Sequence, residues 1–208
     1  MVRVVVNTIY SIGYSGFSID DFLAALKKHN VAAVIDVRSR PFSSYFSNYD
    51  KGALEPVLKK RGVFYRNYAR EFGAQQDDRR YYSAEGYLDF ERFAKARPFL
   101  EGVDKLRAGM ERDYTFALMC AEKRPIDCHR AILVSHAFFD LGYNVIHLMP
   151  NGEMVTQAEL NGQLLEKYYP DRNQLTLFDE PTDDASLLKL AYRRRNAEIG
   201  HRMTEENE

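Results

Sequence analysis

The fold is decided by the stretch Tyr114-Thr-Phe-Ala-Leu-Met-Cys120-Ala-Glu122-Lys123-Arg124-Pro-Ile-Asp127-Cys128-His129-Arg130. Residues 114–119 are almost entirely apolar, as in a strand that is buried on both faces. Asp127 stands where a helix N-cap is expected, and apolar residues then recur at helical spacing until Gly142. This order of strand, loop and helix places Cys120 and Glu122 at the carboxyl end of a sheet, where open α/β sheets bind ligands.

The rest of the chain repeats this alternation. Apolar runs predict further strands over residues 4–12, 31–37, 63–68 and 144–148. Helices are expected after Ser18, over residues 52–61 and 83–96, from Pro98, and from a capping box at Thr156 to Pro170. We therefore predict an α/β fold, a Rossmann-like sandwich with a mostly parallel central sheet and helices on both faces. We expect one domain over residues 1–170 and a helical or extended C-terminal tail over residues 171–208.

Composition narrows the class of protein. The formal net charge of −1 disfavours a protein that coats nucleic acid non-specifically, because such binding neutralises phosphates. The hydrophobic fraction of 45% is ordinary for a soluble protein, and no apolar stretch has the length of a membrane span. Two cysteines do not make a disulfide framework, and the first residues show no signal-peptide cleavage pattern. A cytoplasmic protein with no membrane partner is expected.

Two cysteines and a histidine share the loop after the central strand. Cys120, Cys128 and His129 are candidates for a nucleophile, a base or ligands; the alternative is a buried strand-end thiol and a helix start. A phosphatase loop is excluded, because Ile126 stands where that motif needs arginine. Zinc is not expected, because seven residues separate the cysteines and His147 is the only obvious further ligand. The metal and any cofactor therefore stay unknown at this point.

Two carboxylates are expected at the carboxyl ends of neighbouring strands. Asp36 and Glu122 could share the pocket as an acid/base pair or could hold a divalent metal ion. The structural alternative is that Asp36 pairs with Arg38 or Arg130 and orders the loop. Lys123 could form a Schiff base with an aldehyde substrate, or could simply be solvated.

Positive charge and aromatic residues surround the same place. Arg38, Arg130 and the N–H groups of the helix start predict a phosphate or nucleotide site. The residues expected to bind this ligand are Gly13, Ser15, Arg38, Arg40, Cys128 and Arg130. Aromatic residues such as Tyr45 and Phe46 lie among serines and arginines, a composition typical of base-stacking surfaces. For Tyr65 and Tyr68 the preferred alternative is a place in the core.

Three motifs resemble the domain-of-unknown-function 488 family. They are residues 8–15 (Thr-Ile-Tyr-Ser-Ile-Gly-Tyr-Ser), residues 36–41 (Asp-Val-Arg-Ser-Arg-Pro), and Met119-Cys120-Ala-Glu122-Lys123 followed by Cys128-His129-Arg130. The resemblance spans roughly residues 8–148, and the motifs keep their order and placement. It implies a cytoplasmic bacterial or archaeal protein with a shared pocket that includes Gly13, Asp36 and Arg38. It implies no particular reaction.

A short peptide in the predicted tail suggests a partner. Residues 174–178, Gln-Leu-Thr-Leu-Phe, look like the peptide with which bacterial polymerases and repair proteins bind the sliding clamp, whose pattern is Gln-Leu-Ser/Asp-Leu-Phe. An extended tail can bury Leu175, Leu177 and Phe178 in an apolar groove while Gln174 makes polar contacts. The alternative is that the apolar side chains pack back onto the domain.

Together these features favour a DNA-processing or DNA-repair enzyme, a glycosylase-like or nuclease-like hydrolase or lyase. Such an enzyme would hold a phosphate at the strand-end pocket and be recruited to DNA by the clamp. The expected catalytic residues are Asp36, Cys120, Glu122, Lys123 and His129. The alternatives are an enzyme for a small phosphorylated or nucleotide substrate and a non-catalytic nucleic-acid or clamp adaptor.

Overall fold

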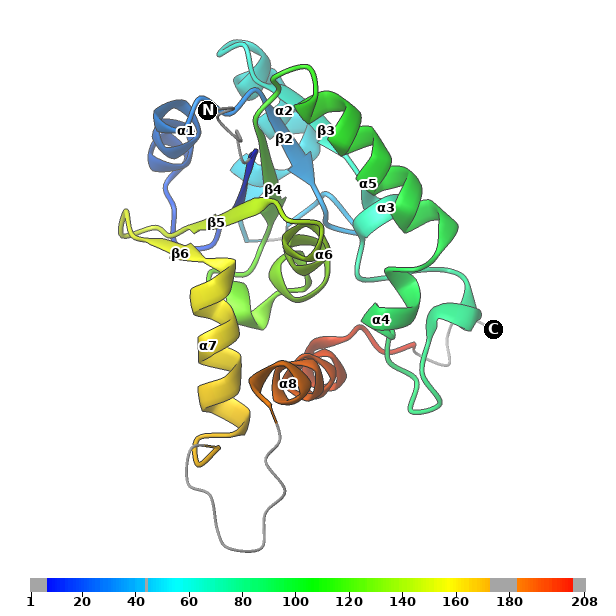
Figure 1. Ribbon diagram of the computed structural model, residues 1–208. Coiled ribbons are helices and arrows are strands. Elements are labelled where there is room, and N and C mark those ends of the chain that lie inside the picture. The colour runs from blue at the N-terminus through cyan, green and yellow to red at the C-terminus, as the bar shows by residue number, and fades with distance from the viewer. Residues whose placement is uncertain (1–6, 44, 173–182, 204–208) are drawn as a thin grey trace, which may run out of the picture.

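We describe residues 7–43, 45–172 and 183–203 of a computed structural model of the chain (Figure 1). The strands are β1 (Thr8–Gly13), β2 (Ala33–Asp36), β3 (Phe64–Asn67), β4 (Phe116–Cys120), β5 (Asn144–Leu148) and β6 (Met154–Thr156). The longer helices are α1 (Ile19–Lys28), α2 (Lys51–Lys59), α5 (Arg97–Met110), α7 (Gln157–Tyr168) and α8 (Asp184–Ile199). The short helical segments are η1 (Ser47–Tyr49), α3 (Ala69–Phe72), η2 (Arg79–Tyr81), α4 (Phe90–Phe93), η3 (Pro125–Asp127), η4 (Arg130–Ser135) and α6 (His136–Asp140).

The strands form one sheet in the order β3-β2-β4-β1-β5-β6. The first five in this order are parallel, and β6 runs antiparallel to β5. β4 lies between β1 and β2, and all of its residues are buried, as its apolar sequence predicts. The predicted α/β class with a mostly parallel sheet is confirmed. Because β2, β4 and β1 are parallel, the loops that follow them meet at one edge of the sheet.

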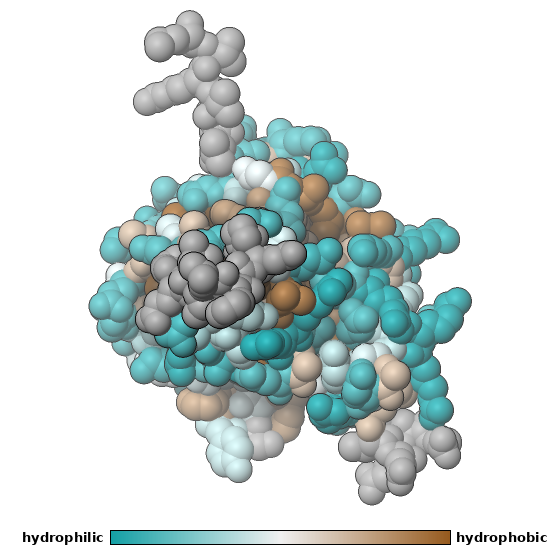
Figure 2. Space-filling model, turned by 60° about the horizontal axis from the view of Figure 1, so that its bottom comes forward, coloured by the Kyte–Doolittle hydropathy of each residue, from teal (hydrophilic) through white to brown (hydrophobic). Residues whose placement is uncertain are grey.

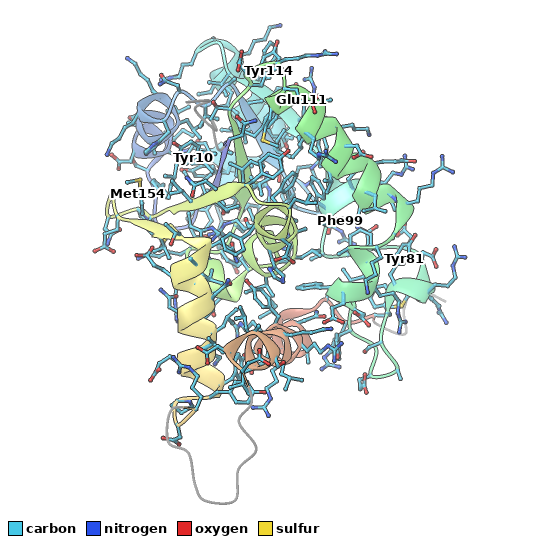
Figure 3. The ribbon with its side chains drawn as sticks, in the orientation of Figure 1. Tyr10, Tyr81, Phe99, Glu111, Tyr114 and Met154 are labelled. Atoms are coloured by element: carbon cyan, nitrogen blue, oxygen red, sulfur yellow. The ribbon has the colours of Figure 1, made fainter. Side chains whose placement is uncertain are left out.

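The sheet separates two apolar cores, and helices cover both faces (Figure 1). On one face, α1 and α2 pack over Val34 and Met119. On the other face, α5, η4 and α6 cover Ile35 and Cys120. Consecutive strand residues alternate between the two cores because their side chains point to opposite faces. Figure 3 labels Phe99 of α5, which belongs to the second of these cores.

Local sequence explains where the main helices begin. The Ser18 side chain accepts a hydrogen bond from the Asp21 N–H at 3.1 Å and caps α1. Thr156 and Glu159 form the predicted capping box of α7. Pro98 stands in the first turn of α5, where its missing N–H costs no helical hydrogen bond.

Residues 83–96 do not form the single helix that was expected. Tyr82 and Leu88 form an antiparallel bridge, so the chain first makes a narrow turn, and the short α4 follows it. The Asp89 side chain caps α4 by accepting a hydrogen bond from the Arg92 N–H at 3.0 Å. The helical periodicity of this stretch therefore reflects core packing around a turn rather than a long helix.

The helix after Cys128 also begins later than expected. Cys128 has extended backbone angles (φ −132°, ψ 135°), and η4 starts at Arg130 with His129 as its N-cap. Asp127 is therefore not an N-cap. It pairs instead with Arg124 and with Arg195 of α8.

The packed part of the chain extends beyond residue 170. α8 lies against α7 and η4, and it buries Ala191, Tyr192 and Arg195. Figure 2 shows the face that comes forward below the sheet as mostly hydrophilic, with hydrophobic side chains gathered in small groups. Within the described residues, no helix has the length and hydrophobicity that crossing a membrane requires.

Candidate metal centre

The loop after β4 brings four chemically active side chains together. Cys120 ends β4, and Glu122 follows two residues later. η3 then turns the chain back, so that Cys128 and His129 arrive directly before η4. Cys120, Cys128 and His129 are buried, whereas Glu122 is exposed as a residue but turns its carboxylate inward against the two sulfur atoms. This group of four, which we call the thiol cluster, therefore meets solvent on the side of Glu122.

The thiol cluster is compact. Glu122 Oε2 lies within hydrogen-bond distance of both sulfur atoms, 3.0 Å from the Cys120 Sγ and 2.8 Å from the Cys128 Sγ. His129 Nδ1 lies 3.9 Å from the Cys120 Sγ and 4.0 Å from the Cys128 Sγ. The ligand atoms of these cysteines and the histidine all lie within 4.8 Å of one another. In a tetrahedral zinc site the same atoms stand roughly 3.5 to 3.8 Å apart, so a small contraction would seat the ion.

The ring of His129 is oriented by the loop after β2. Its Nε2 lies 2.9 Å from the carbonyl oxygen of Val37, which can only accept a hydrogen bond. Nε2 therefore carries the proton, and Nδ1 turns toward the sulfur atoms. Metal-binding histidines are held in the same way, by a hydrogen bond from the other ring nitrogen.

Burial and neighbouring charges shift the acidity of the thiol cluster. Burial opposes ionisation of Cys128, but the hydrogen bond from Cys120 and the charges of Arg130 and His129 hold its pKa well below the usual range. The hydrogen bond to Cys128 and burial raise the pKa of Cys120. Burial, together with the charge of Cys128, raises the pKa of Glu122. Burial lowers the pKa of His129, but Cys128 more than offsets this, and the net shift is upward. One thiolate beside one thiol suits a cation or a nucleophile.

Arg130 supports the loop from within. Its side chain is fully buried and donates hydrogen bonds to the Ser11 hydroxyl at 3.0 Å and to the carbonyl oxygens of Glu122 at 2.6 Å and Lys123 at 3.4 Å. The guanidinium is therefore engaged inside the protein. The structure does not support the predicted phosphate role of Arg130.

Asp36 lies in the other core. Its carboxylate accepts hydrogen bonds from the Arg38 guanidinium, the shortest at 2.6 Å, and from the Tyr65 hydroxyl at 2.6 Å. Strand alternation places Asp36 on the side of α1 and α2, while Cys120 faces the core under α5. The prediction that Asp36 and Glu122 share a ligand is therefore wrong, and the alternative pairing with Arg38 is confirmed.

Some of the remaining residues predicted to bind a ligand make hydrogen bonds within the protein, and others are exposed on its surface. The Arg38 guanidinium is buried against Asp36, whose hydrogen bonds and charge raise its pKa against the opposing effect of burial. A phosphate role for Arg38 is therefore not supported either. The Ser15 N–H donates to the carbonyl oxygen of Ala121 at 3.0 Å and joins the loops after β1 and β4. Lys123 and Arg40 are both exposed.

His147, the further ligand considered from the sequence, lies apart from the two cysteines. The Nε2–H group of His147 donates a hydrogen bond to the side-chain carbonyl oxygen of Gln157 at 2.9 Å, and burial lowers the pKa of His147 to about 3. It does not belong to the thiol cluster. His129, next to Cys128 in the chain, is the histidine that lies with the two cysteines. Residues 174–178, with the predicted clamp-binding side chains of Gln174, Leu175, Leu177 and Phe178, lie outside the described residues.

The fold and the thiol cluster define an α/β protein with a buried two-cysteine, one-histidine site under a glutamate. The chain belongs to the family described as "Domain of unknown function DUF488", whose model matches residues 18–137. The resemblance predicted from the three motifs is thereby confirmed. No curated protein and no solved structure matches the chain.

Proposed function

We propose that the protein is a zinc-dependent hydrolase whose metal is held by Cys120, Cys128 and His129. The observation that carries this proposal is the convergence of three ligand atoms within 4.8 Å, with a carboxylate oxygen against both sulfurs. Catalytic zinc sites have three protein ligands and an open position, and two cysteines with one histidine are a known set. Two sulfur donors favour zinc over magnesium or calcium.

Glu122 is suited to proton transfer at the open position. It is exposed, whereas the three ligands are buried, so a substrate and a water molecule approach from its side. Burial of its carboxylate raises the pKa of Glu122, which is the direction that helps a general acid hold a proton and deliver it. A bound zinc ion supplies Lewis-acid activation of water. With zinc held by Cys120, Cys128 and His129, Glu122 would take a proton from the attacking water and would return it to the leaving group.

The first substrates to test are amino-substituted nucleobases. Zinc deaminases combine a two-cysteine, one-histidine ligand set with a neighbouring glutamate that is not a ligand. In that reaction water adds to the ring carbon, the carbon–nitrogen bond breaks, and ammonia leaves with the proton that the glutamate delivers. The likeness is one of chemistry at the site, and it extends to no other part of the chain.

The test of the metal is elemental analysis of the purified full-length chain. We expect about one zinc ion per chain in the wild type and loss of the metal in Cys120→Ser, Cys128→Ser and His129→Ala. His29→Ala is the matched control, because His29 lies at the end of α1, and it retains the metal. A wild-type metal content equal to that of the ligand variants would overturn the proposal.

Glu122→Gln separates a catalytic from a purely structural zinc site. If Glu122 transfers protons, the variant keeps its zinc and loses ammonia release from cytosine- or adenine-containing substrates. If Glu122 is instead a fourth ligand of a closed site, zinc affinity falls with the substitution, and the hydrolase proposal fails.

Action on DNA and recruitment by the sliding clamp are supported by sequence alone. Residues 174–178 carry the peptide that resembles clamp-binding motifs, and they select DNA over free nucleotides as the working environment. Calorimetric titration of this peptide into a bacterial clamp tests the proposal. Binding that disappears when Leu177 and Phe178 are replaced by alanine supports it, and no binding by the unaltered peptide refutes it.

A further inference from the structure

Three exposed aromatic side chains lie within five residues of sequence after β2. Tyr45 exposes 92% of its surface, Phe42 67% and Phe46 41%. Such residues carry large apolar surfaces, and folded proteins usually bury most of that area. Three of them exposed within five residues therefore indicate a ligand that covers them.

Two contacts anchor described residues on either side of Tyr45. The Ser43 N–H donates a hydrogen bond to the Asp50 carboxylate at 2.6 Å. The ring of Phe46 meets that of Tyr14 edge to face, with the centroids 5.7 Å apart. An anchored ring such as that of Phe46 loses less conformational freedom when a flat ligand stacks on it.

A polar cavity of about 330 Å³ adjoins this segment, and Arg40 and Arg70 line it. This volume suits a phosphate group or a nucleobase. No hydrogen bond or ion pair joins the Arg40 side chain to another described residue. Arg70 makes a 3.4 Å contact with Glu101, and both side chains are partly exposed. Asp77, the one acidic lining residue, is exposed, so the two arginines give the cavity a positive balance.

The cavity is connected to the thiol cluster through the loop after β2. Arg40 follows Val37 by three residues, so their Cα atoms are at most about 11 Å apart. The carbonyl oxygen of Val37 contacts His129. Ser39 fixes the cavity wall, because its hydroxyl accepts a hydrogen bond from the Gln75 N–H at 2.8 Å. A ligand in the cavity therefore lies close to the candidate metal centre.

We propose that Phe42, Tyr45 and Phe46, together with Arg40 and Arg70, form a binding surface for single-stranded nucleic acid. We call these five residues the aromatic surface. This names the substrate class of the hydrolase and therefore rests on the proposed function. Proteins that bind single strands stack successive bases on aromatic rings and hold the backbone with nearby cations. A duplex hides the faces of its bases and cannot stack in this way.

The test is a fluorescence anisotropy titration of the full chain with a labelled single strand of about 12 nucleotides, a usual site size. We expect the single strand to bind at least about tenfold more tightly than the duplex of the same sequence. The double substitution Phe42→Ala/Tyr45→Ala raises Kd about tenfold or more. Strands of DNA and RNA with the same sequence show which of the two the surface prefers.

A matched control removes the same two residue types elsewhere. Phe64 and Tyr114 expose 53% and 42% of their surfaces. Phe64 begins β3 and Tyr114 lies just before β4, so both stand at the edge of the sheet opposite the thiol cluster. Figure 3 labels Tyr114. Phe64→Ala/Tyr114→Ala leaves Kd unchanged. Equal losses in the two double variants, or tighter binding of the duplex, would overturn the proposal. Thermal unfolding of each variant confirms that the chain still folds.

The contribution of charge is tested by salt dependence. Each phosphate that a cation neutralises on a single strand adds about 0.7 to the slope of log K against log salt concentration. Arg40→Gln therefore reduces the magnitude of this slope by about 0.7. Arg112→Gln removes an exposed cation just after α5 and leaves the slope unchanged. An unchanged slope in Arg40→Gln would exclude Arg40 from the aromatic surface.

The two proposals fail in different ways. If the chain binds the single strand but holds no zinc, the aromatic surface stands and the hydrolase does not. If the chain holds zinc but does not prefer the single strand, the metal site stands and the aromatic surface is wrong. Cys128→Ser provides the cross-check, because it removes a metal ligand and leaves the aromatic residues in place.

Discussion

The carbonyl oxygen of Glu122 occupies the space where Gly13 would carry a β-carbon. An ideal β-carbon built on Gly13 would lie 1.8 Å from that oxygen and 2.8 Å from the nearest nitrogen of Arg130. The loop that carries the thiol cluster thus lies directly on the end of β1. Glycine is the only residue type without a β-carbon, so only glycine at position 13 allows the loop to lie this close to the end of β1.

Gly13→Ala is expected to displace the loop and to abolish metal binding. The clash involves backbone atoms on both sides, so it cannot be relieved by a side-chain rotation, and we expect a loss of several kcal/mol of stability. Urea denaturation and zinc content are the measurements. Gly162→Ala is the matched control, because its β-carbon meets nothing within 4 Å in α7, and it should stabilise the protein by about 0.5 to 1 kcal/mol. Equal effects of the two substitutions would contradict the contact.

The tautomer of His129 can be observed directly. The 2.9 Å hydrogen bond from Nε2 to Val37 predicts a proton on Nε2 and a ligand lone pair on Nδ1. A long-range proton–nitrogen NMR spectrum of the zinc-loaded chain should show this pattern for His129. The spectrum of His129→Ala identifies the signal. A proton on Nδ1 would exclude this nitrogen as a zinc ligand.

Tyr65→Phe is expected to destabilise the protein through the Asp36 carboxylate. The Tyr65 hydroxyl donates a 2.6 Å hydrogen bond to Asp36, and both residues are buried. Hydrogen bonds to charged groups contribute about 1.5 to 3 kcal/mol, and urea denaturation should show a loss of this size. Tyr143→Phe removes a hydroxyl from a half-buried ring and should change stability much less. Similar losses of stability in both variants would show that the hydrogen bond from Tyr65 to Asp36 contributes no more than an ordinary tyrosine hydroxyl.

Acid should destabilise the protein through His147. Burial and the charge of Arg130 lower its pKa to about 3, against the opposing effects of Gln157 and Cys128. The unfolded chain binds a proton below its ordinary pKa of 6.5, while the folded chain stays neutral until the pH falls to about 3. The contribution is therefore fully present above pH 6.5 and is lost as the pH falls through this window, by at most about 1.4 kcal/mol per pH unit.

The measurement is urea denaturation between neutral pH and pH 4, with the slope of stability against pH as the readout. His147→Gln should reduce this slope whatever its effect on absolute stability. His29→Gln changes a partly exposed histidine and should leave most of the slope of stability against pH unchanged. A slope unaltered by His147→Gln would show that His147 titrates normally in the folded protein.

Arg195 is expected to stabilise the loop that carries the thiol cluster. Its guanidinium donates to the carbonyl oxygen of Ile126 at 2.8 Å and pairs with Asp127. Arg195→Ala leaves a buried carbonyl without its donor, and we expect a loss of about 1 to 3 kcal/mol with weaker zinc binding. Arg194→Ala, one residue earlier on α8, removes a guanidinium that lies over the ring of Tyr169, and it should change stability by less than 1 kcal/mol. Zinc affinities that do not differ between the two variants would refute the coupling.

The sequence predicted the sheet well because its strands are short, apolar and separated by turn residues. The residues expected over 144–148 form β5 with the same limits, and the run that ends at Cys120 forms the buried central strand. The prediction of a single helix over residues 83–96 was wrong, because the apolar residues that contact the core around a turn have the same spacing as those of a helix. β6 was not predicted, because three residues are too few to show the alternation of apolar and polar side chains that is typical of a strand.

The thiol cluster was predicted residue by residue but not as a ligand set. Seven residues between Cys120 and Cys128 give no short metal-binding motif, and the turn made by η3 decides that the two sulfurs meet. The face on which Asp36 lies depends on a shift of one residue along β2, since alternate side chains enter different cores. Such a shift cannot be read from an apolar run that is buried on both faces.

The ion pair between Asp127 and Arg195 can form only after the ribosome has synthesised α8. Asp127 and Arg195 are 68 residues apart in the chain. At about 5 to 20 residues per second, a ribosome makes the second partner roughly 3 to 14 s after the first. During this interval the two cysteines and His129 have been synthesised, but the turn between the cysteines lacks its contacts with Arg195. On the proposal that this loop holds a zinc ion, we therefore expect the ion to be held securely only after the last described helix has been made.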